Sequence, residues 1–218
     1  MPSAFVPRSV VGALLNYRGA LARLGESVNQ PPYKAPPKAP VLYVKPRNTF
    51  AHDADAVRIP MGVPALEAGA ALGLVIGESA CRIAESHALD AVAGYVIVND
   101  VSVPHESFFR PAVRFKARDG FCPIGRVVPR SAVPDPDALG VRVFIDGELK
   151  QQNSTANLVR RCARLIADVS AFMTLSPGDV LLVGVPEGAP LVRAGQRAAI
   201  EIDGLGRLEN PFIAEEAA

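Results

Sequence analysis

Proline and glycine recur along the whole chain and interrupt it too often for long helices. The sequence contains 20 prolines and 18 glycines in 218 residues. Proline removes a backbone donor and glycine favours turns, so this composition is typical of short strands rather than of a helical bundle. Hydrophobic residues make up 49% of the chain, which is enough for a sizeable core. We therefore expect an α+β fold in which strands dominate.

Short apolar segments bounded by turn residues mark the expected strands. They cover residues 10–17, 41–44, 72–76, 95–98, 141–145, 180–185, 198–202 and 205–208. The segment 31–40 is too rich in proline for a helix or a central strand and is expected to be a loop. This pattern divides the chain into residues 1–40, an N-terminal strand and proline-rich loop, and residues 41–218, the main domain.

One long helix is predicted over residues 155–173. Ser154 or Thr155 is suited to cap its N-terminus. Apolar residues recur through the segment at the spacing of one helix face: Leu158, Cys162, Leu165, Val169 and Phe172. We interpret this stripe as a core-facing surface.

Charge and motifs exclude several classes of protein. The net charge is +1 with both signs interspersed, unlike the basic face of a nucleic-acid-binding protein. No apolar run approaches the ~20 residues of a membrane span, and the run at residues 10–15 is too short for a signal peptide, so we expect a cytoplasmic protein. Gly204-Leu205-Gly206 is not a dinucleotide-binding loop, because Glu209 occupies the position of the third glycine.

Two charged residues mark a candidate site. The apolar strand at residues 95–98 ends in Asn99-Asp100, and Lys116 precedes a turn at Asp119-Gly120-Phe121. A carboxylate at a strand end with a lysine nearby indicates a metal site or an oxyanion site. The segment 66–77 is almost wholly apolar, although a metal site would need further carboxylates there.

The order and spacing of several segments resemble the fumarylacetoacetate hydrolase family. The likeness runs from about residue 40 to residue 211 and includes the following segments: Val75-Ile76-Gly77, Asn99-Asp100-Val101-Ser102, Lys116, Asp119-Gly120-Phe121, Gln151-Gln152-Asn153-Ser154-Thr155 and Ser176-Pro177-Gly178-Asp179. The fold implied is a mixed β-sandwich or roll. A narrower likeness, carried by Lys45-Pro46-Arg47 and Arg118-Asp119-Gly120, is to the N-terminal half of two-domain isomerase/decarboxylases of aromatic catabolism.

The resemblance implies a divalent cation, Mg²⁺ or Mn²⁺, held by three carboxylates in active members. The Asp after Asn is one of them and corresponds to Asp100. The other two come from a Glu-x-Glu segment whose positions hold Gly69 and Ala71 in this chain. Glu67 lies two residues earlier, about 7 Å away along a strand, and is a poor substitute. We therefore expect Asp100 to be the only residual metal-ligand candidate and this chain alone to bind no metal.

Two further departures point the same way. Active relatives carry a His and a Glu three residues apart as a proton-transfer dyad, and those positions hold Ala20 and Arg23. Threonines of the relatives are replaced by Val183 and Val185. Three parts of one site have thus changed.

The resemblance implies roles for the remaining residues. Lys116 and Asp100 are the catalytic candidates, and the candidates for binding substrate are Lys45, Arg47 and Arg118. The simplest alternative is that Asp100 caps a turn and that Lys116 pairs with Asp100 or with Asp119, without a functional role.

Three functions follow from these expectations. The first is the N-terminal subunit of an isomerase/decarboxylase for 2-oxo or 2-hydroxy-dienoic acids, degenerate at its own metal site and paired with a paralogous C-terminal-type subunit or with itself. The second is a stand-alone isomerase that uses Lys116, Asp100 and Arg47 and works without a metal. The third is a metabolite-binding module without turnover.

Overall fold

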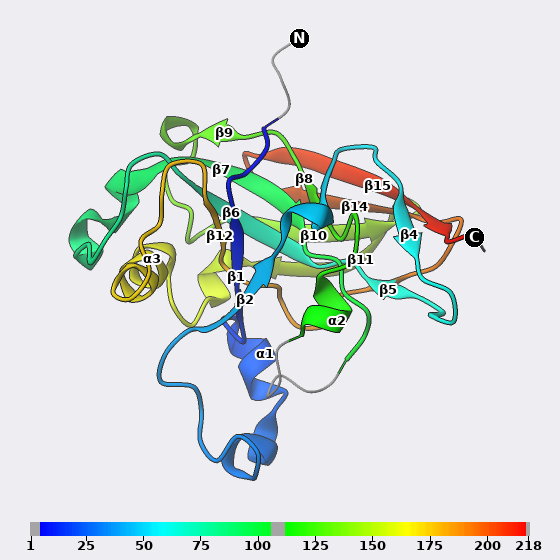
Figure 1. Ribbon diagram of the computed structural model, residues 1–218, viewed down its shortest axis with the longest axis horizontal. Coiled ribbons are helices and arrows are strands. Elements are labelled where there is room, and N and C mark those ends of the chain that lie inside the picture. Colours follow the sequence, from blue (N-terminus) through cyan, green and yellow to red (C-terminus); the bar gives the residue numbers. More distant parts are fainter. Residues whose placement is uncertain (1–4, 106–111, 217–218) are drawn as a thin grey trace.

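The computed structural model describes residues 5–105 and 112–216, and strands form most of its regular structure (Figure 1). The strands are β1 Val10–Leu14, β2 Val41–Lys45, β3 Phe50–His52, β4 Val57–Ile59, β5 Leu66–Glu67, β6 Ala70–Ile76, β7 Val92–Asn99, β8 Cys122–Ile124, β9 Val128–Pro129, β10 Gly140–Ile145, β11 Glu148–Ser154, β12 Val180–Leu182, β13 Leu191–Val192, β14 Arg197–Ile202 and β15 Gly206–Ala214. The α-helices are short: α1 Arg18–Ala22, α2 Val113–Lys116 and α3 Cys162–Ser170. Short 3₁₀ helices are η1 Gly25–Asn29, η2 Arg47–Thr49, η3 Glu85–Ala91, η4 Arg130–Ala132 and η5 Thr155–Asn157.

The larger sheet has the strand order β2-β1-β12-β6-β7-β8-β3. Its two end strands, β2 and β3, are separated in sequence only by the 3₁₀ turn η2 and its flanking proline, so the sheet curls back on itself. β1 lies inside this sheet, parallel to β12 and antiparallel to β2.

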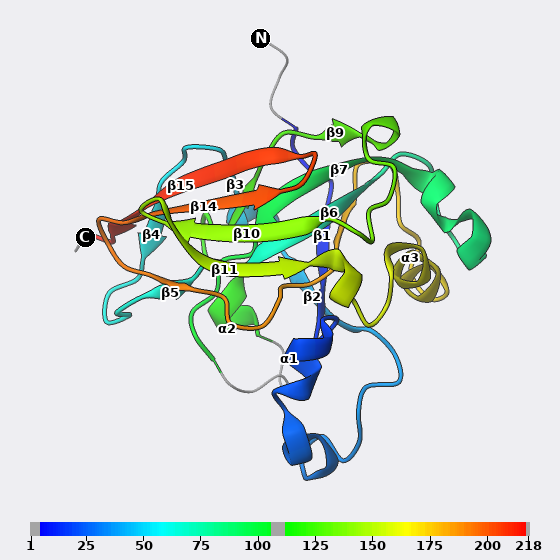
Figure 2. The same ribbon diagram turned by 180° about the vertical axis from the view of Figure 1, so that it is seen from behind.

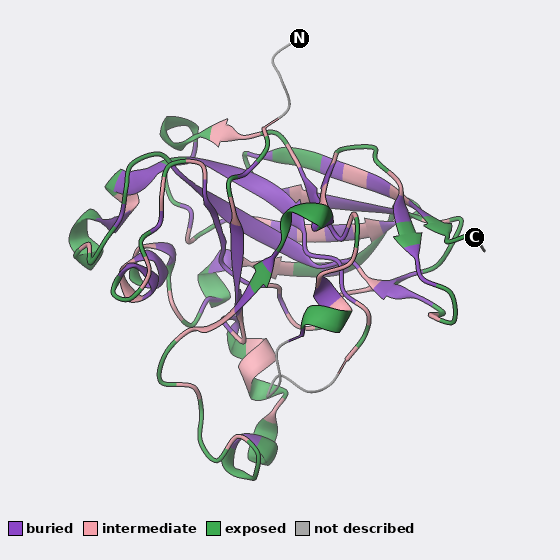
Figure 3. Cartoon of the chain, viewed as in Figure 1, coloured by how far each residue is buried: buried purple, intermediate pink, exposed green. Residues whose placement is uncertain are grey.

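The smaller sheet packs against the outer face of the larger one. Its order is β11-β10-β14-β15-β4, and Figure 2 shows this sheet with β6 and β7 behind it. Their facing side chains form the main core together with α3, and Figure 3 shows the buried residues concentrated in these central strands. The hairpin predicted at Asp146-Gly147 joins β10 and β11, and both turn residues have positive φ, as a type I′ turn requires.

The inner face of the curled sheet encloses a second, smaller apolar cluster. Alternate residues of the strands point into it, among them Val96 and Val98 of β7 and Ala71 and Val75 of β6. Because side chains alternate along a strand, the next inward position after Val98 is Asp100. The same alternation on β2 places Tyr43 and Lys45 inward, where both are buried, and leaves Val44 60% exposed.

The helix predicted over residues 155–173 is wrong at both ends. Only Cys162–Ser170 is α-helical, and Phe172, predicted in the buried stripe, is 68% exposed. Residues 158–160 are instead held by the N-terminal segment: Val159 N donates to Asn16 O (2.8 Å), and Arg160 N donates to Asn16 Oδ1 (2.9 Å). These contacts with a distant segment outweigh the helical pattern of the apolar residues.

The caps of this region also differ from the prediction. Ser154 caps the 3₁₀ turn η5 by accepting a hydrogen bond from Ala156 N (3.2 Å). The N-terminus of α3 is capped from a distant loop: Cys162 N donates a hydrogen bond to Asp137 Oδ1 (2.9 Å). In the described part of the chain, none of the helices is long and apolar enough to cross a membrane.

Candidate functional site

Asp100 lies at one end of the curled sheet, directly after β7. The register of β6 and β7 pairs Ala70 with Asn99 and Ala71 with Val98, so Gly69 is the next partner and faces Asp100. Two hydrogen bonds hold the segments together: Asp100 N donates to the backbone Gly69 O (2.8 Å), and Gly69 N donates to the side-chain Oδ1 of Asn99 (3.1 Å). These bonds fix the backbone of Asn99 and Asp100, at the predicted end of the strand, against the segment at Gly69.

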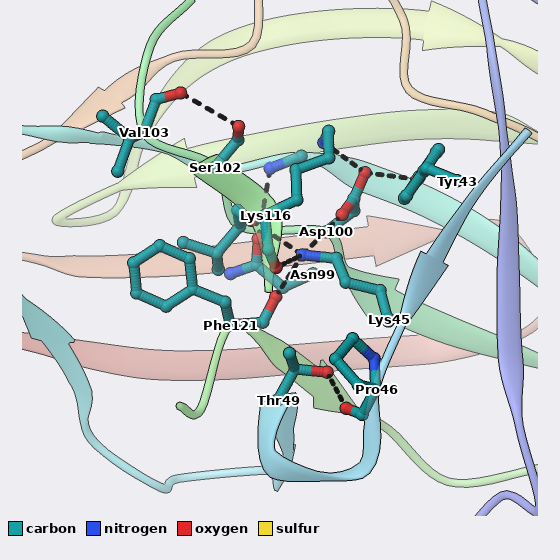
Figure 4. A network of polar contacts seen from close by, with 12 residues as sticks. Tyr43, Lys45, Pro46, Thr49, Asn99, Asp100, Ser102, Val103, Lys116 and Phe121 are labelled. Atoms are coloured by element: carbon teal, nitrogen blue, oxygen red, sulfur yellow. Dashed lines mark hydrogen bonds and ion pairs between the residues drawn. The ribbon is translucent and has the colours of Figure 1, made fainter. Parts of the chain in front are cut away.

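The Asp100 carboxylate is enclosed by two ammonium groups and a phenol (Figure 4). Lys45 Nζ lies 2.8 Å from Oδ1, and Lys116 Nζ lies 2.7 Å from Oδ2. Tyr43 Oη donates to Oδ2 over 2.5 Å. Asp100 is 1% exposed. Two cations therefore neutralise one buried anion, and the group as a whole carries a net positive charge.

Lys45 is wholly engaged with its surroundings. Besides its ion pair with Asp100, its Nζ donates to the carbonyl oxygens of Val101 (2.8 Å), Lys116 (2.9 Å) and Phe121 (2.8 Å). The residue is 1% exposed, and an ammonium group has only three hydrogens to donate. In this arrangement Lys45 has no donor left for a substrate, although the sequence placed it among the substrate-binding candidates.

The ion pairs set the charge states of this cluster. Burial alone would raise the pKa of Asp100, but Lys116 and Lys45 together hold the pKa of its carboxyl well below the usual range. Burial lowers the pKa of Lys45, and Asp100 opposes that shift. Burial and the neighbouring Asp100 raise the pKa of the Tyr43 phenol, so Tyr43 stays protonated and donates to the carboxylate.

Lys116 differs from Lys45 because it also faces a cavity. This cavity has a volume of about 340 Å³ and is lined by Ala13, Leu14, Leu15, Ala20, Arg23, Leu24, Tyr43, Glu67, Gly69, Asp100, His105, Lys116, Val185, Pro186, Glu187, Gly188 and Ala189. Lys116 Nζ lies 4.9 Å from the centre of the Tyr43 ring, which adds a cation–π contact. Lys116 thus pairs with Asp100 on one side and lines the cavity on the other.

The cavity gathers most positions that the sequence singled out. Asp100, Lys116, Glu67 and Gly69 line it, and so do Ala20 and Arg23 from the segment around α1. Ala71 is fully buried on the inner face of β6. None of the three predicted substrate-binding residues lines this cavity: Lys45 is buried behind Asp100, Arg47 is exposed in η2, and Arg118 lines a different cavity.

Three residues of the site were missed by the sequence reasoning. Tyr43 could have been found, because the pattern Tyr43-Val44-Lys45 puts the tyrosine on the same strand face as Lys45. His105 stacks on Phe115 with ring centres 4.8 Å apart, and its Nδ1 lies 3.0 Å from Val103 O; burial lowers its pKa. Glu187 Oε1 accepts from Asn153 Nδ2 (3.2 Å). No local sequence signal marks Glu187.

Glu67 carries a second carboxylate on the cavity wall. Burial raises its pKa, and Lys116 partly opposes this shift. A raised pKa stabilises the fold below the ordinary value of 4.5, and this contribution is lost as the pH rises through the folded-state pKa. We expect Glu67→Gln to be more stable than the wild type at pH 7. Urea unfolding at pH 4 and at pH 7 measures the effect, and an advantage that does not grow with pH would contradict it.

Comparison with known proteins identifies the family. The sequence model described as fumarylacetoacetate (FAA) hydrolase C-terminal matches residues 9–213. The chain belongs to this family. The strand-dominated α+β fold predicted from the sequence is confirmed by solved relatives. The 5-carboxymethyl-2-hydroxymuconate delta-isomerase from Mycobacterium smegmatis superposes with a TM-score of 0.84 at 28% identity, over 98% of this chain and 81% of that one.

Two further relatives bear on the chemistry of this fumarylacetoacetate hydrolase family member. A 4-hydroxyphenylacetate degradation bifunctional isomerase/decarboxylase from Salmonella dublin is 41% identical over 95% of this chain and 48% of its own length. The chain therefore spans about half the length of this curated relative. Fumarylpyruvate hydrolase from Pseudomonas aeruginosa, solved with Mn²⁺ and pyruvate, has a TM-score of 0.83 at 28% identity, covering 99% of this chain and 93% of that one.

The residues around Asp100 do not fit the divalent cation that the family implies. Both oxygens of Asp100 face ammonium groups at 2.7–2.8 Å, and the neighbouring inward positions are Gly69 and Ala71, which offer no side-chain oxygen. Among the described residues no cluster of three His, Cys, Asp or Glu side chains is placed to hold a metal ion. A hard cation such as Mg²⁺ needs several oxygen ligands of its own, and here two lysines already neutralise the carboxylate.

Proposed function

We propose that this chain is a subunit of an isomerase/decarboxylase that acts on 2-oxo or 2-hydroxy-dienoic acids in aromatic catabolism, and that its own metal site is degenerate. The observation that carries the proposal is the enclosed carboxylate: Asp100, the candidate metal ligand that the family resemblance implies, is paired with Lys45 and Lys116. The 41% identity to one half of a bifunctional isomerase/decarboxylase supports the reaction class.

In this proposal a metal-competent paralogue of the C-terminal type carries the metal-dependent chemistry. The relative from Salmonella dublin is about twice as long as the segment matched by this chain, which leaves room for a second half in that protein. A duplicated domain can keep its pairing surface after one copy loses its site, because an interface between similar copies depends on the surface and not on the site. This chain would then contribute structure to the assembly, and its cavity would be free of the metal-dependent step.

The experiment compares the chain alone with the chain plus a C-terminal-type paralogue. We expect the purified chain to show no metal-stimulated isomerisation or decarboxylation of a 2-hydroxy-diene dioic acid, and the mixture to show activity and to co-elute as one species in size-exclusion chromatography. A lone chain with Mg²⁺-stimulated turnover would contradict the degenerate site. Failure of the two chains to associate would contradict the subunit role.

A second function is favoured by the cavity itself. Lys116 and Glu67 line the same cavity, so an ammonium group and a carboxylate of raised pKa are both available to a bound 2-oxo acid. Such a pair could move a proton from carbon and stabilise the enolate that forms, without a metal. Isomerase activity of the lone chain that survives chelation and is lost in Lys116→Met would support this function over the first. Activity abolished by chelation would exclude it.

A further inference from the structure

A second cavity lies on the other side of the turn that follows Lys116. Its volume is about 420 Å³, and it is lined by Ala56, Arg58, Pro60, Arg118, Asp119, Gly120, Phe121 and Glu215. These residues come from the region of β4, from the turn before β8 and from the end of β15. Space beside Gly120 is open, because a Cβ built there would meet no heavy atom within 4 Å. Polar groups from three separate segments therefore face one hollow.

Two guanidinium groups in this cavity lack an acidic partner. Among the described residues neither Arg58 nor Arg118 has a carboxylate within 4.0 Å, whereas Arg142, Arg197 and Arg207 all form ion pairs. Arg118 is half-buried, and its Nε donates to Arg114 O (3.2 Å). This bond fixes the stem of the side chain and leaves both terminal nitrogens as donors.

The two carboxylates of the cavity are engaged elsewhere. Asp119 Oδ1 accepts from Asn48 Nδ2 (2.7 Å), and Glu215 Oε2 accepts from Met61 N (3.3 Å). Asp119 and Glu215 reduce the positive potential of the cavity, but neither forms an ion pair with Arg58 or Arg118 among the described residues. The unmatched groups are therefore hydrogen-bond donors with positive charge, and the ligand they suit is an anion with oxygen acceptors.

We propose that this second cavity binds a small oxyanion, a carboxylate or a phosphate, between Arg58 and Arg118. The planar fork of a guanidinium group matches the paired oxygens of either anion, and such charge-assisted bonds are about twice as strong as neutral ones. Arg58 is exposed on β4, so its side chain can adjust to a ligand. The side chain of Arg118 is held by its hydrogen bond to Arg114 O. Because the cavity is open and holds two acidic side chains, the affinity is in the millimolar range.

The site shares a wall with the candidate active site. The turn at residues 118–121 lines the second cavity, and the carbonyl oxygens of Phe121 and Lys116 accept hydrogen bonds from Lys45 on its other side. An anion bound to Arg118 therefore restrains the same turn that holds Lys45 against Asp100. We expect the anion to slow amide hydrogen exchange in residues 117–121.

Titration calorimetry of the full chain with inorganic phosphate, and separately with succinate, tests the proposal. We expect millimolar binding of at least one anion, weakened roughly tenfold or more in Arg58→Gln and in Arg118→Gln. Arg126→Gln, at an exposed arginine outside this cavity, is the matched control and should bind like the wild type. The tighter of the two anions shows whether the site selects phosphate or carboxylate.

Lys116→Met separates this site from the first cavity, where an anion could also meet a cation. Binding that persists in Lys116→Met and is lost in Arg58→Gln supports the second cavity. Binding that is lost in Lys116→Met and unchanged in both arginine variants would overturn the proposal. The absence of binding of either anion at tens of millimolar would overturn it as well.

Discussion

Asp100→Asn is expected to lower the free energy of unfolding by about 3–5 kcal/mol, because it leaves two buried ammonium groups without their shared counter-ion. Lys45 and Lys116 are both buried, and Lys45 cannot reach water without breaking the hydrogen bonds that hold its ammonium group. Guanidinium chloride unfolding followed by circular dichroism measures the change. Asp119→Asn is the matched control, because Asp119 is exposed and accepts from a neutral asparagine, and its effect should be below about 1 kcal/mol.

The pH dependence of this effect has a defined sign. The pKa of Asp100 is held below its ordinary value of 3.8, so its contribution to stability is present above that value and is lost as the pH falls through the folded-state pKa. The difference between wild type and Asp100→Asn should therefore be largest near neutral pH and should shrink in acid below about pH 4. A difference that is small at pH 7, or that grows in acid, would contradict the ion-pair network.

Gly69→Ala is expected to have the second-largest effect. A Cβ at this position would overlap the carbonyl oxygen of Asp100 and would lie 3.1 Å from the Val185 side chain. The oxygen belongs to the backbone and is fixed by the strand pairing, so the clash must move β6 relative to β7. We expect a loss of about 1–3 kcal/mol, as for other overpacked positions.

Gly125→Ala is the control for Gly69→Ala. A Cβ at Gly125 would meet Ile97 O at 3.3 Å and otherwise only ordinary contacts, so this substitution should cost clearly less. Equal losses in the two variants would show that Gly69 is not specially constrained. The expected clash also means that Gly69→Glu with Ala71→Glu will not rebuild a metal site by side-chain replacement alone, because the carbonyl oxygen of Asp100 leaves no room for a Cβ at position 69.

Much of the candidate site could be predicted from local sequence patterns. The alternation of β7 and the Asn99-Asp100 ending placed Asp100 at the end of that strand, and the register of β6 against β7 puts Gly69 opposite Asp100. The simplest alternative left open whether Lys116 pairs with Asp100 or with Asp119, and the structure shows the ion pair with Asp100 at 2.7 Å. These features depend on the alternation of side chains along a strand, which can be predicted from the sequence pattern.

The remaining features depend on contacts between distant segments. The carbonyl oxygens that bind Lys45 belong to Val101, Lys116 and Phe121, which are distant in sequence. The residues next to position 45 therefore do not predict that all its donors are used within the protein. Arg118 lies only two residues from Lys116, but Lys116 lines the first cavity and Arg118 lines the second one together with the rest of the turn at residues 118–121. The helix predicted from residue 155 begins only at Cys162, because Asn16 holds residues 159 and 160 in another conformation.

Titration calorimetry of the isolated chain with Mg²⁺ and with Mn²⁺ tests the central claim most directly. The account predicts no binding of either cation up to millimolar concentration, because Asp100 is neutralised by Lys45 and Lys116 and no carboxylate stands at positions 69 and 71. Binding in the micromolar range that is lost in Asp100→Asn, in a variant shown by circular dichroism to be folded, would contradict it. That result would mean that Glu67 or another carboxylate completes a metal site around Asp100.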